Sequence, residues 1–225
     1  LTVNGGSFSG NSATANGGAI YNAGTSLTFT NATQISGNSA TANGGAVYNA
    51  ANGLVLANAG FTGNNAKLGG AFYNAGQNVS VTSVHFGGTT KEDGNTAETS
   101  GGAVYNTGEL TLADTAMSYN QAKASGGAVY NAGTITAAGE FTSNTSVSGG
   151  VIYNIGTATV TGTLTLNQAT DGGAIYNAGT LTLTGATVGG TEEEGNKATS
   201  GGGLYNAGAL TVNGGSFSGN SATAN

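Results

Sequence analysis

Short runs of alternating apolar and polar residues recur along the whole chain, and glycine or asparagine separates one run from the next. In the stretch from Gly172 to Ser200 the first run is AIY and the second is LTLT, which follows Asn177-Ala178-Gly179. In other stretches the third run is an apolar residue with asparagine three places later, as in FTSN from Phe141. Alternation of this kind, rich in Leu, Val, Ile, Thr and Phe, predicts β-strands. Each stretch is therefore expected to form three short strands joined by three turns.

The first run belongs to a motif of two glycines, two small or apolar residues, tyrosine and asparagine, which occurs eight times. Successive copies begin 23 to 32 residues apart, which is too long for one hairpin and too short for a domain. A unit of that length buries its apolar face by stacking on its neighbours. We expect an all-β parallel β-helix of about eight coils that runs as one continuous segment over residues 1–225. The motif copies begin at Gly17, Gly44, Gly69, Gly101, Gly126, Gly149, Gly172 and Gly201.

Stacked coils would align the apolar residues of each run into a buried column, with about 4.8 Å between neighbouring strands. The second run would form a second sheet around pairs such as Leu110 and Leu112, and the third run a third sheet around residues such as Phe141. A charge at Val104 is expected to break the stack locally. The column of the first sheet is Ile20, Val47, Phe72, Val104, Val129, Ile152, Ile175 and Leu204.

The last residue of each motif is an asparagine, which tolerates turn conformations and can hydrogen-bond to its own copy in the next coil. The second glycine of each motif is expected to adopt a positive φ or to allow a bend without a Cβ clash. A second asparagine ladder is expected at the end of the third run, at positions such as Asn120 and Asn144. The first ladder is Asn22, Asn49, Asn74, Asn106, Asn131, Asn154, Asn177 and Asn206.

A tyrosine lies between the inward apolar residue and the asparagine of each motif, so alternation points it outward. One interpretation is that the stacked aromatic rings simply stabilise a sheet face. The alternative is a platform for glycans or for a second rod. The column is Tyr21, Tyr48, Tyr73, Tyr105, Tyr130, Tyr153, Tyr176 and Tyr205.

The first sixteen residues, Leu1 to Asn16, recur unchanged from Leu210 to Asn225, a displacement of 209 residues. This repeat indicates a longer array, either of covalent tandem blocks or of subunits joined end to end, and the unchanged sequence favours the covalent array. Neighbouring copies of the same block are therefore the expected partners, end to end and also laterally.

The composition argues against several classes of function. Four lysines, no arginine and a net charge of −6 leave nothing to neutralise a phosphate backbone, which argues against nucleic-acid binding. The absence of cysteine excludes disulfides and thiolate metal sites. No apolar run approaches the roughly 18 residues of a membrane-spanning helix, so any anchor or secretion signal is expected outside this stretch. We expect no cofactor.

Two acidic insertions, four units apart, interrupt the regular spacing. Carboxylates on a flexible loop are hard oxygen ligands and raise a Ca²⁺ hypothesis. Neither an EF-hand nor a GGxGxD pattern is present, which favours solvated loops. The candidate ligands are Glu92, Asp93 and Glu98 in the first insertion and Glu192, Glu193 and Glu194 in the second.

An enzyme of the polysaccharide-cleaving kind would need closely placed carboxylates on one sheet face. The acids outside the insertions are scattered in the sequence, and His85 is the single histidine, so we expect no enzyme. Outward threonines such as Thr111, Thr136 and Thr182 resemble the flat ranks of ice-binding solenoids. Val55 and Ser80 interrupt that column, and threonine is also a common occupant of exposed strand positions.

With GGA[IV]YN and FxxN both present, nearly the whole chain resembles the repeat of chlamydial polymorphic outer-membrane proteins and related adhesin-like bacterial surface proteins. The two motifs of that repeat fall on segments such as Gly17–Ile20 and Phe8–Asn11. The resemblance implies a right-handed β-helix passenger that is secreted, extracellular, exposed on a cell surface and often adhesive. It does not supply the ligand, for which a host-surface molecule or a glycan is the candidate. The leading hypothesis is a rigid structural segment of an extracellular bacterial fibre or surface stalk. The second hypothesis is the spacer or passenger of an adhesin, and the third is an ice-binding protein.

Overall fold

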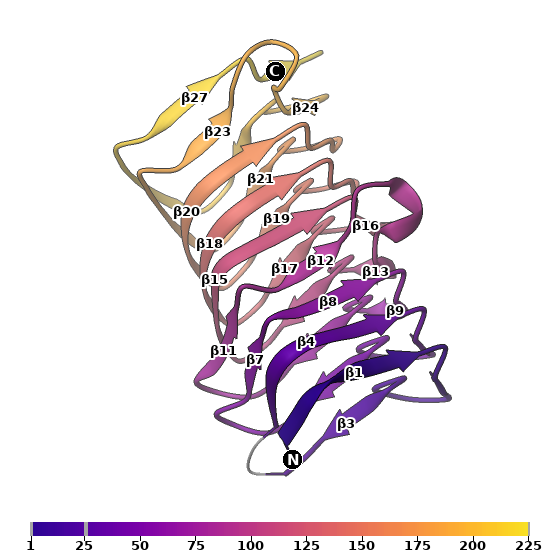
Figure 1. Ribbon diagram of the computed structural model, residues 1–225. Coiled ribbons are helices and arrows are strands. Elements are labelled where there is room, and N and C mark those ends of the chain that lie inside the picture. Colours follow the sequence, from indigo (N-terminus) through magenta and orange to yellow (C-terminus); the bar gives the residue numbers. More distant parts are fainter. Residues whose placement is uncertain (1, 25–26, 225) are drawn as a thin grey trace.

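A computed structural model describes residues 2–24 and 27–224, and it is a parallel β-solenoid of about nine turns (Figure 1). The chain climbs from the N-terminal to the C-terminal end, crosses the near face of Figure 1 from left to right and returns behind, so the coil is right-handed. Each strand pairs in parallel with its counterpart in the next coil. The predicted fold class is confirmed.

The tyrosine motifs form an eight-stranded sheet, here named the tyrosine sheet. Its register places Val104 between Phe72 and Val129, and it aligns tyrosine with tyrosine and asparagine with asparagine throughout. The strands are β3 (Ile20–Asn22), β6 (Val47–Asn49), β10 (Phe72–Asn74), β14 (Val104–Asn106), β17 (Val129–Asn131), β19 (Ile152–Asn154), β21 (Ile175–Asn177) and β25 (Leu204–Asn206).

The second and third runs lie in one 13-stranded sheet, the long sheet, and not in two separate sheets as the sequence predicts. In several coils both runs form a single strand, and in β15 a register shift between Leu112 and Thr115 lies at the junction of the two runs. The strands are β1 (Thr2–Ser9), β4 (Thr28–Ser36), β7 (Val55–Ala57), β8 (Ala59–Thr62), β11 (Val79–Thr82), β12 (His85–Gly87), β15 (Glu109–Ser118), β18 (Thr134–Thr142), β20 (Thr157–Thr165), β22 (Thr180–Thr184), β23 (Thr187–Gly189), β26 (Ala209–Asn213) and β27 (Ser216–Ser218).

The third side of the coil is made of very short strands, here named the short-strand sheet, that follow the asparagine of the third run. Isolated bridges through Thr145 and Gln168 connect its five-stranded part to its two-stranded part. Pairs such as Ser-Ala carry no visible alternation, so the sequence did not indicate these strands. They are β2 (Ser12–Ala13), β5 (Ser39–Ala40), β9 (Asn65–Leu68), β13 (Thr96–Ser100), β16 (Gln121–Ala122), β24 (Lys197–Ala198) and β28 (Ser221–Ala222).

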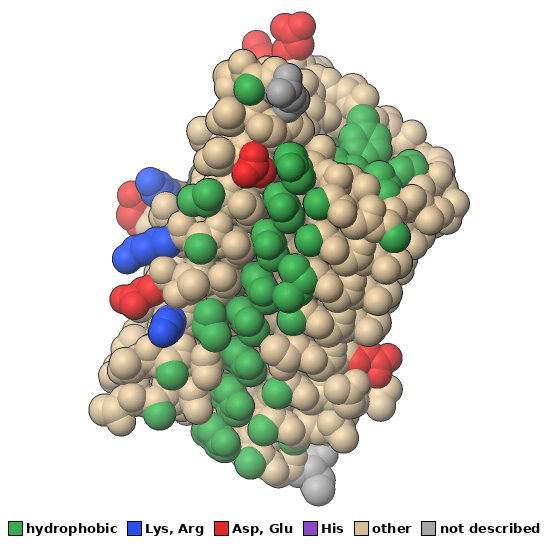
Figure 2. Space-filling view, turned by 180° about the vertical axis from the view of Figure 1, so that it is seen from behind, with side chains coloured by type: hydrophobic (Ala, Val, Ile, Leu, Met, Phe, Trp, Pro, Cys, Tyr) green, Lys and Arg blue, Asp and Glu red, His purple; other side chains and the backbone are tan. Residues whose placement is uncertain are grey.

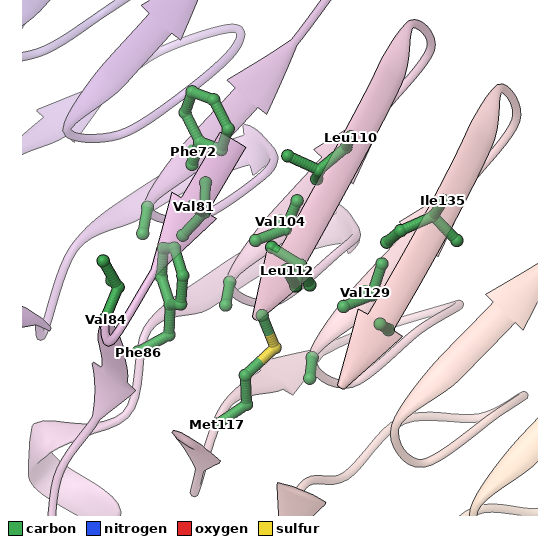
Figure 3. Packing of buried hydrophobic residues seen from close by; sticks show 14 of the residues in the cluster. Phe72, Val81, Val84, Phe86, Val104, Leu110, Leu112, Met117, Val129 and Ile135 are labelled. Atoms are coloured by element: carbon green, nitrogen blue, oxygen red, sulfur yellow. The ribbon is translucent and has the colours of Figure 1, made fainter. Parts of the chain in front are cut away.

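The core consists of the predicted apolar columns, which meet inside the coil (Figure 3). Val104, Leu112 and Met117 are fully buried, and Figure 3 shows them facing one another across the interior of one coil. The columns persist along the rod until the last coil, where Val212 and Phe217 remain 48% and 45% exposed. In the first coil, which also pairs with one neighbour, Val3 is buried, so the core is least covered at the C-terminal end.

The two motif glycines have different roles, and the predicted role of the second is corrected in part. The first glycine has the positive φ, as at Gly126 with φ 66°. The second has no positive φ, but a Cβ at Gly127 would collide with the carbonyl oxygen of Gly150 in the next coil. One glycine is needed for backbone conformation and the other for close stacking.

Each acidic insertion leaves the coil directly after a long-sheet strand. The first contains the 3-10 helix η1 (Lys91–Asp93), which projects from the side of the rod in Figure 1. The second, around Glu193, is a turn after β23. Among the described residues, no helix has the length and apolar character needed to cross a bilayer.

Candidate functional surfaces

The eight tyrosines form a continuous stack on the outer face of the tyrosine sheet, visible as an apolar stripe along the rod in Figure 2. Ring centroids of successive tyrosines are 4.5–5.3 Å apart, and successive rings are tilted by only 6–15°. The interior rings are half-buried because their neighbours cover them. The predicted outward column is therefore present as a stack of nearly parallel rings.

The stacking determines which parts of the rings are accessible. Both faces of an interior ring such as Tyr105 lie against its neighbours, so its edge and hydroxyl are left for an external partner. A sugar that stacks on an aromatic face would find a free face only at the ends, at Tyr21 and Tyr205. This geometry favours the interpretation that the ladder stabilises the sheet.

Stacking also affects the ionisation of the phenols. Burial, followed by the charges of Tyr130 and Tyr73, raises the pKa of Tyr105 to about 12. Burial and neighbouring tyrosines also raise the pKa of Tyr48 and of Tyr153. The folded state therefore favours the neutral phenol more strongly than the unfolded chain does.

Alkaline pH is expected to destabilise the rod through this ladder. A raised tyrosine pKa contributes stability that is fully present below the unfolded value of 10.0 and is lost as pH rises towards about 12. The urea midpoint, followed by circular dichroism, should fall over that range. The Tyr105→Phe variant keeps the ring but cannot ionise there, so its midpoint should fall less. Equal pH profiles for the two proteins would contradict this role of Tyr105.

The asparagine ladder at the end of each motif is present at every predicted position. Asn106 Nδ2 donates to Asn131 Oδ1 at 2.8 Å, and Asn131 Nδ2 donates to Asn154 Oδ1 at 2.8 Å. The interior members are fully buried, and the same amide nitrogen also donates to a backbone carbonyl of its own turn, as from Asn106 to Gly108. The ladder joins the coils along the corner between the tyrosine sheet and the long sheet.

The second asparagine ladder is more extensive than the sequence predicts. It includes Asn95, Asn167 and Asn196 in addition to the expected members. Asn167 follows leucine, not phenylalanine, in the pattern LxxN, and in the other two coils the acidic insertion separates the apolar residue from the asparagine. Allowing Leu or Val at the apolar position and a variable spacing would have found all three.

One carboxylate in each insertion, Asp93 in the first and Glu194 in the second, accepts hydrogen bonds within its own turn. Asp93 Oδ2 accepts hydrogen bonds from the backbone N–H groups of Thr89 and Thr90 at 3.2 and 3.1 Å. Glu194 Oε2 accepts from the N–H of Thr191 at 3.1 Å. Glu98 lies in β13 on another side of the rod, and in the described part of the chain no three His, Asp or Glu side chains gather to hold a metal ion.

The outer face of the long sheet carries a groove that the sequence did not indicate. Three hollows of about 650, 500 and 430 Å³ follow one another along it; the first two share His85, and the second and third share Glu140 and Thr163. Asp114 and Glu194 also line it, and no lysine does. We name this surface, with His85, Asp114, Glu140 and Glu194, the acidic groove.

Strand register creates the acidic groove. His85 pairs with Ala116, which pairs with Glu140, so residues more than fifty positions apart in sequence lie on one outward column. Small residues line the second hollow, among them Gly139 and Gly162, which pair with each other in β18 and β20. Asp114, Glu140 and Glu194, which are far apart in the sequence, therefore line one groove in the folded chain.

The outward threonine column of the long sheet has the predicted composition and interruptions. Thr28 pairs with Val55, Val55 with Ser80, and Ser80 with Thr111. The column then continues through threonine to the last coil. The threonine column is continuous over the C-terminal coils and is interrupted by Val55 and Ser80 near the N-terminal end.

Fold and surfaces together define a β-solenoid repeat protein. Residues 5–23 and 32–50 match the family of the Chlamydia polymorphic membrane protein (Chlamydia_PMP) repeat, which confirms the resemblance in these two segments. No curated protein and no solved structure matches the chain. In these two segments, which contain the motif copies that begin at Gly17 and Gly44, the chain is similar to the repeat of a membrane-protein family.

Proposed function

We propose that this chain is a segment of a rigid extracellular rod, part of a fibre or a long cell-surface stalk that is built from tandem 209-residue blocks. The supporting observation concerns the sixteen-residue segment that occurs twice. As residues 2–13 it pairs with the following coil through β4 and β5, and as residues 211–222 it pairs with the preceding coil through β22, β23 and β24.

The two occurrences together use both hydrogen-bonding edges of one and the same coil. Thr2 pairs with Thr28, and the equivalent Thr211 pairs with Thr182. Phe8 pairs with Ile35, and the equivalent Phe217 pairs with Val188. A coil placed between two blocks would therefore find a matching strand above and below, and the exposed Val212 and Phe217 would be covered.

A chain of several blocks should form a straight rod whose length increases linearly with the number of blocks. Eight coils at about 4.8 Å each predict about 38 Å of added length per block. Chains of one, two and three blocks, joined so that residue 209 is followed by a new Leu1, should show this increment by electron microscopy and small-angle scattering. Blocks that behave as separately tumbling beads, or a length that does not rise linearly, would contradict the proposal.

The runner-up function is the spacer or passenger of a surface adhesin, and the match to the Chlamydia_PMP repeat is the observation that favours it. The two functions differ in what lies at the end of the rod. Images of the native assembly should show free or bundled filaments of uniform width for a fibre, and a membrane anchor with a distinct tip for an adhesin.

A further inference from the structure

We propose that these rods associate side by side, with the lysine-bearing flank of one copy seated in the acidic groove of a second copy. The inference deepens the proposed function, because it rests on rods of several blocks. Its basis is a separation of charge on the rod surface that composition alone does not reveal.

Three of the four lysines lie along one side of the rod. Lys67 is in β9, Lys123 directly follows β16 and Lys197 is in β24, all exposed on the short-strand sheet, with Glu98 among them. Figure 2 shows lysine side chains along one edge of the molecule, with acidic side chains beside them. We name these four residues the basic flank; its formal charge is positive, although the chain as a whole carries −6.

The acidic groove has the opposite charge and a concave shape. Asp114, Glu140 and Glu194 supply three carboxylates, and no lysine lines the hollows. The lysine side chains of the basic flank are long and exposed, so they can reach the carboxylates of the acidic groove on a second copy. Opposite potentials on two faces of one chain favour association between copies and oppose contact between like faces.

The charges also match in spacing. Lys67 and Lys123 lie two coils apart, because β9, β13 and β16 are successive strands of their sheet. Glu140 and Glu194 are also separated by two coils, through β18, β20 and β23. Each spacing is about 9.6 Å at about 4.8 Å per coil. A parallel neighbour shifted by three coils would bring Lys67 to Glu140 and Lys123 to Glu194 together.

A second copy of the rod suits this groove because both have the same coil repeat, so contacts recur in every block. Exposed ion pairs contribute only about 0–1 kcal/mol each, so single blocks should remain monomeric. In a covalent array the pairs of successive blocks act together, and the association strengthens with block number. Salt should weaken it, since the screening length falls from about 10 Å at 0.1 M to about 3 Å at 1 M.

The experiment compares three-block chains by light scattering and electron microscopy across a salt series. Unchanged chains should bundle at low salt and separate at 1 M. A flank variant (Lys67→Glu with Lys123→Glu) and a groove variant (Glu140→Lys with Glu194→Lys) should each lose bundling. A one-to-one mixture of the two should bundle again, because each reversed face then meets its complement. Glu109→Lys, at an exposed position at the start of β15 and outside the lining of the hollows and the basic flank, is the matched charge control and should leave bundling unchanged.

Each outcome decides the question. Chains that stay single at low salt, bundling that ignores salt, or a mixture that fails to recover while both variants are folded by circular dichroism would overturn the lateral contact. If the length of the chains still increases with the number of blocks, these results contradict only the lateral contact and not the proposed rod. If the length does not increase with the number of blocks, the proposed function is wrong, and the lateral contact loses its basis.

Discussion

Replacing Val104 by aspartate is expected to lower the stability of the rod by about 3–5 kcal/mol, the scale of an uncompensated buried charge. Val104 is fully buried in β14, where it packs between Phe72 and Val129 of the adjacent coils. No cation lies in that column to pair with the carboxylate. The measurement is the free energy of unfolding from urea denaturation followed by circular dichroism.

Thr111→Asp provides the matched control for Val104→Asp. Thr111 lies on β15 in the next part of the same coil, but its side chain faces outward and is exposed. Its effect should stay within about 0.5 kcal/mol, as for other surface changes. A similar loss in the two variants would show that aspartate disturbs these strands through the backbone and not through burial.

Replacing Asn144 by aspartate is expected to have an effect of similar size, a loss of about 2–6 kcal/mol of stability near neutral pH. Asn144 Nδ2 donates to the carbonyl oxygen of Met117 at 2.9 Å and to Asn167 Oδ1 at 3.1 Å. Aspartate has the same shape but no such donor, so two buried acceptors lose their partner at about 1–3 kcal/mol each. The aspartate keeps a side-chain oxygen in the place of Asn144 Oδ1, which accepts a hydrogen bond from Asn120 Nδ2.

The variant should also gain a pH dependence that distinguishes this mechanism. Burial among acceptors raises the folded-state pKa of the new carboxyl above its unfolded value of about 3.9. The variant is therefore least destabilised below that value and loses stability as pH rises through the folded pKa. Asn144→Leu should show no such dependence, and Asn65→Asp, on the exposed β9, should have little effect at any pH. A pH-independent deficit in Asn144→Asp would contradict the role of the lost donor.

The repeat motifs predicted the main features of the fold, for a local reason. Residues such as Val104, Tyr105 and Asn106 stand at fixed distances from two glycines, so their inward or outward direction follows from alternation. The merging of two runs into the long sheet could not be predicted, because alternation identifies each run by itself and does not show whether the chain stays in one sheet between them. The acidic groove depends on strand register across coils of unequal length, which brings His85 and Glu140 into one column.

In the proposed array, the coil that presents one edge in β1 and the other in β26 and β27 would make the contacts between blocks equivalent, whatever the number of blocks. In such an array, gain or loss of a whole block would leave every remaining contact unchanged. Length could therefore change in single genetic events at no cost in folding, whereas a partial block would break strand register. The reach of such a surface structure would then be set by copy number and not by new mutations.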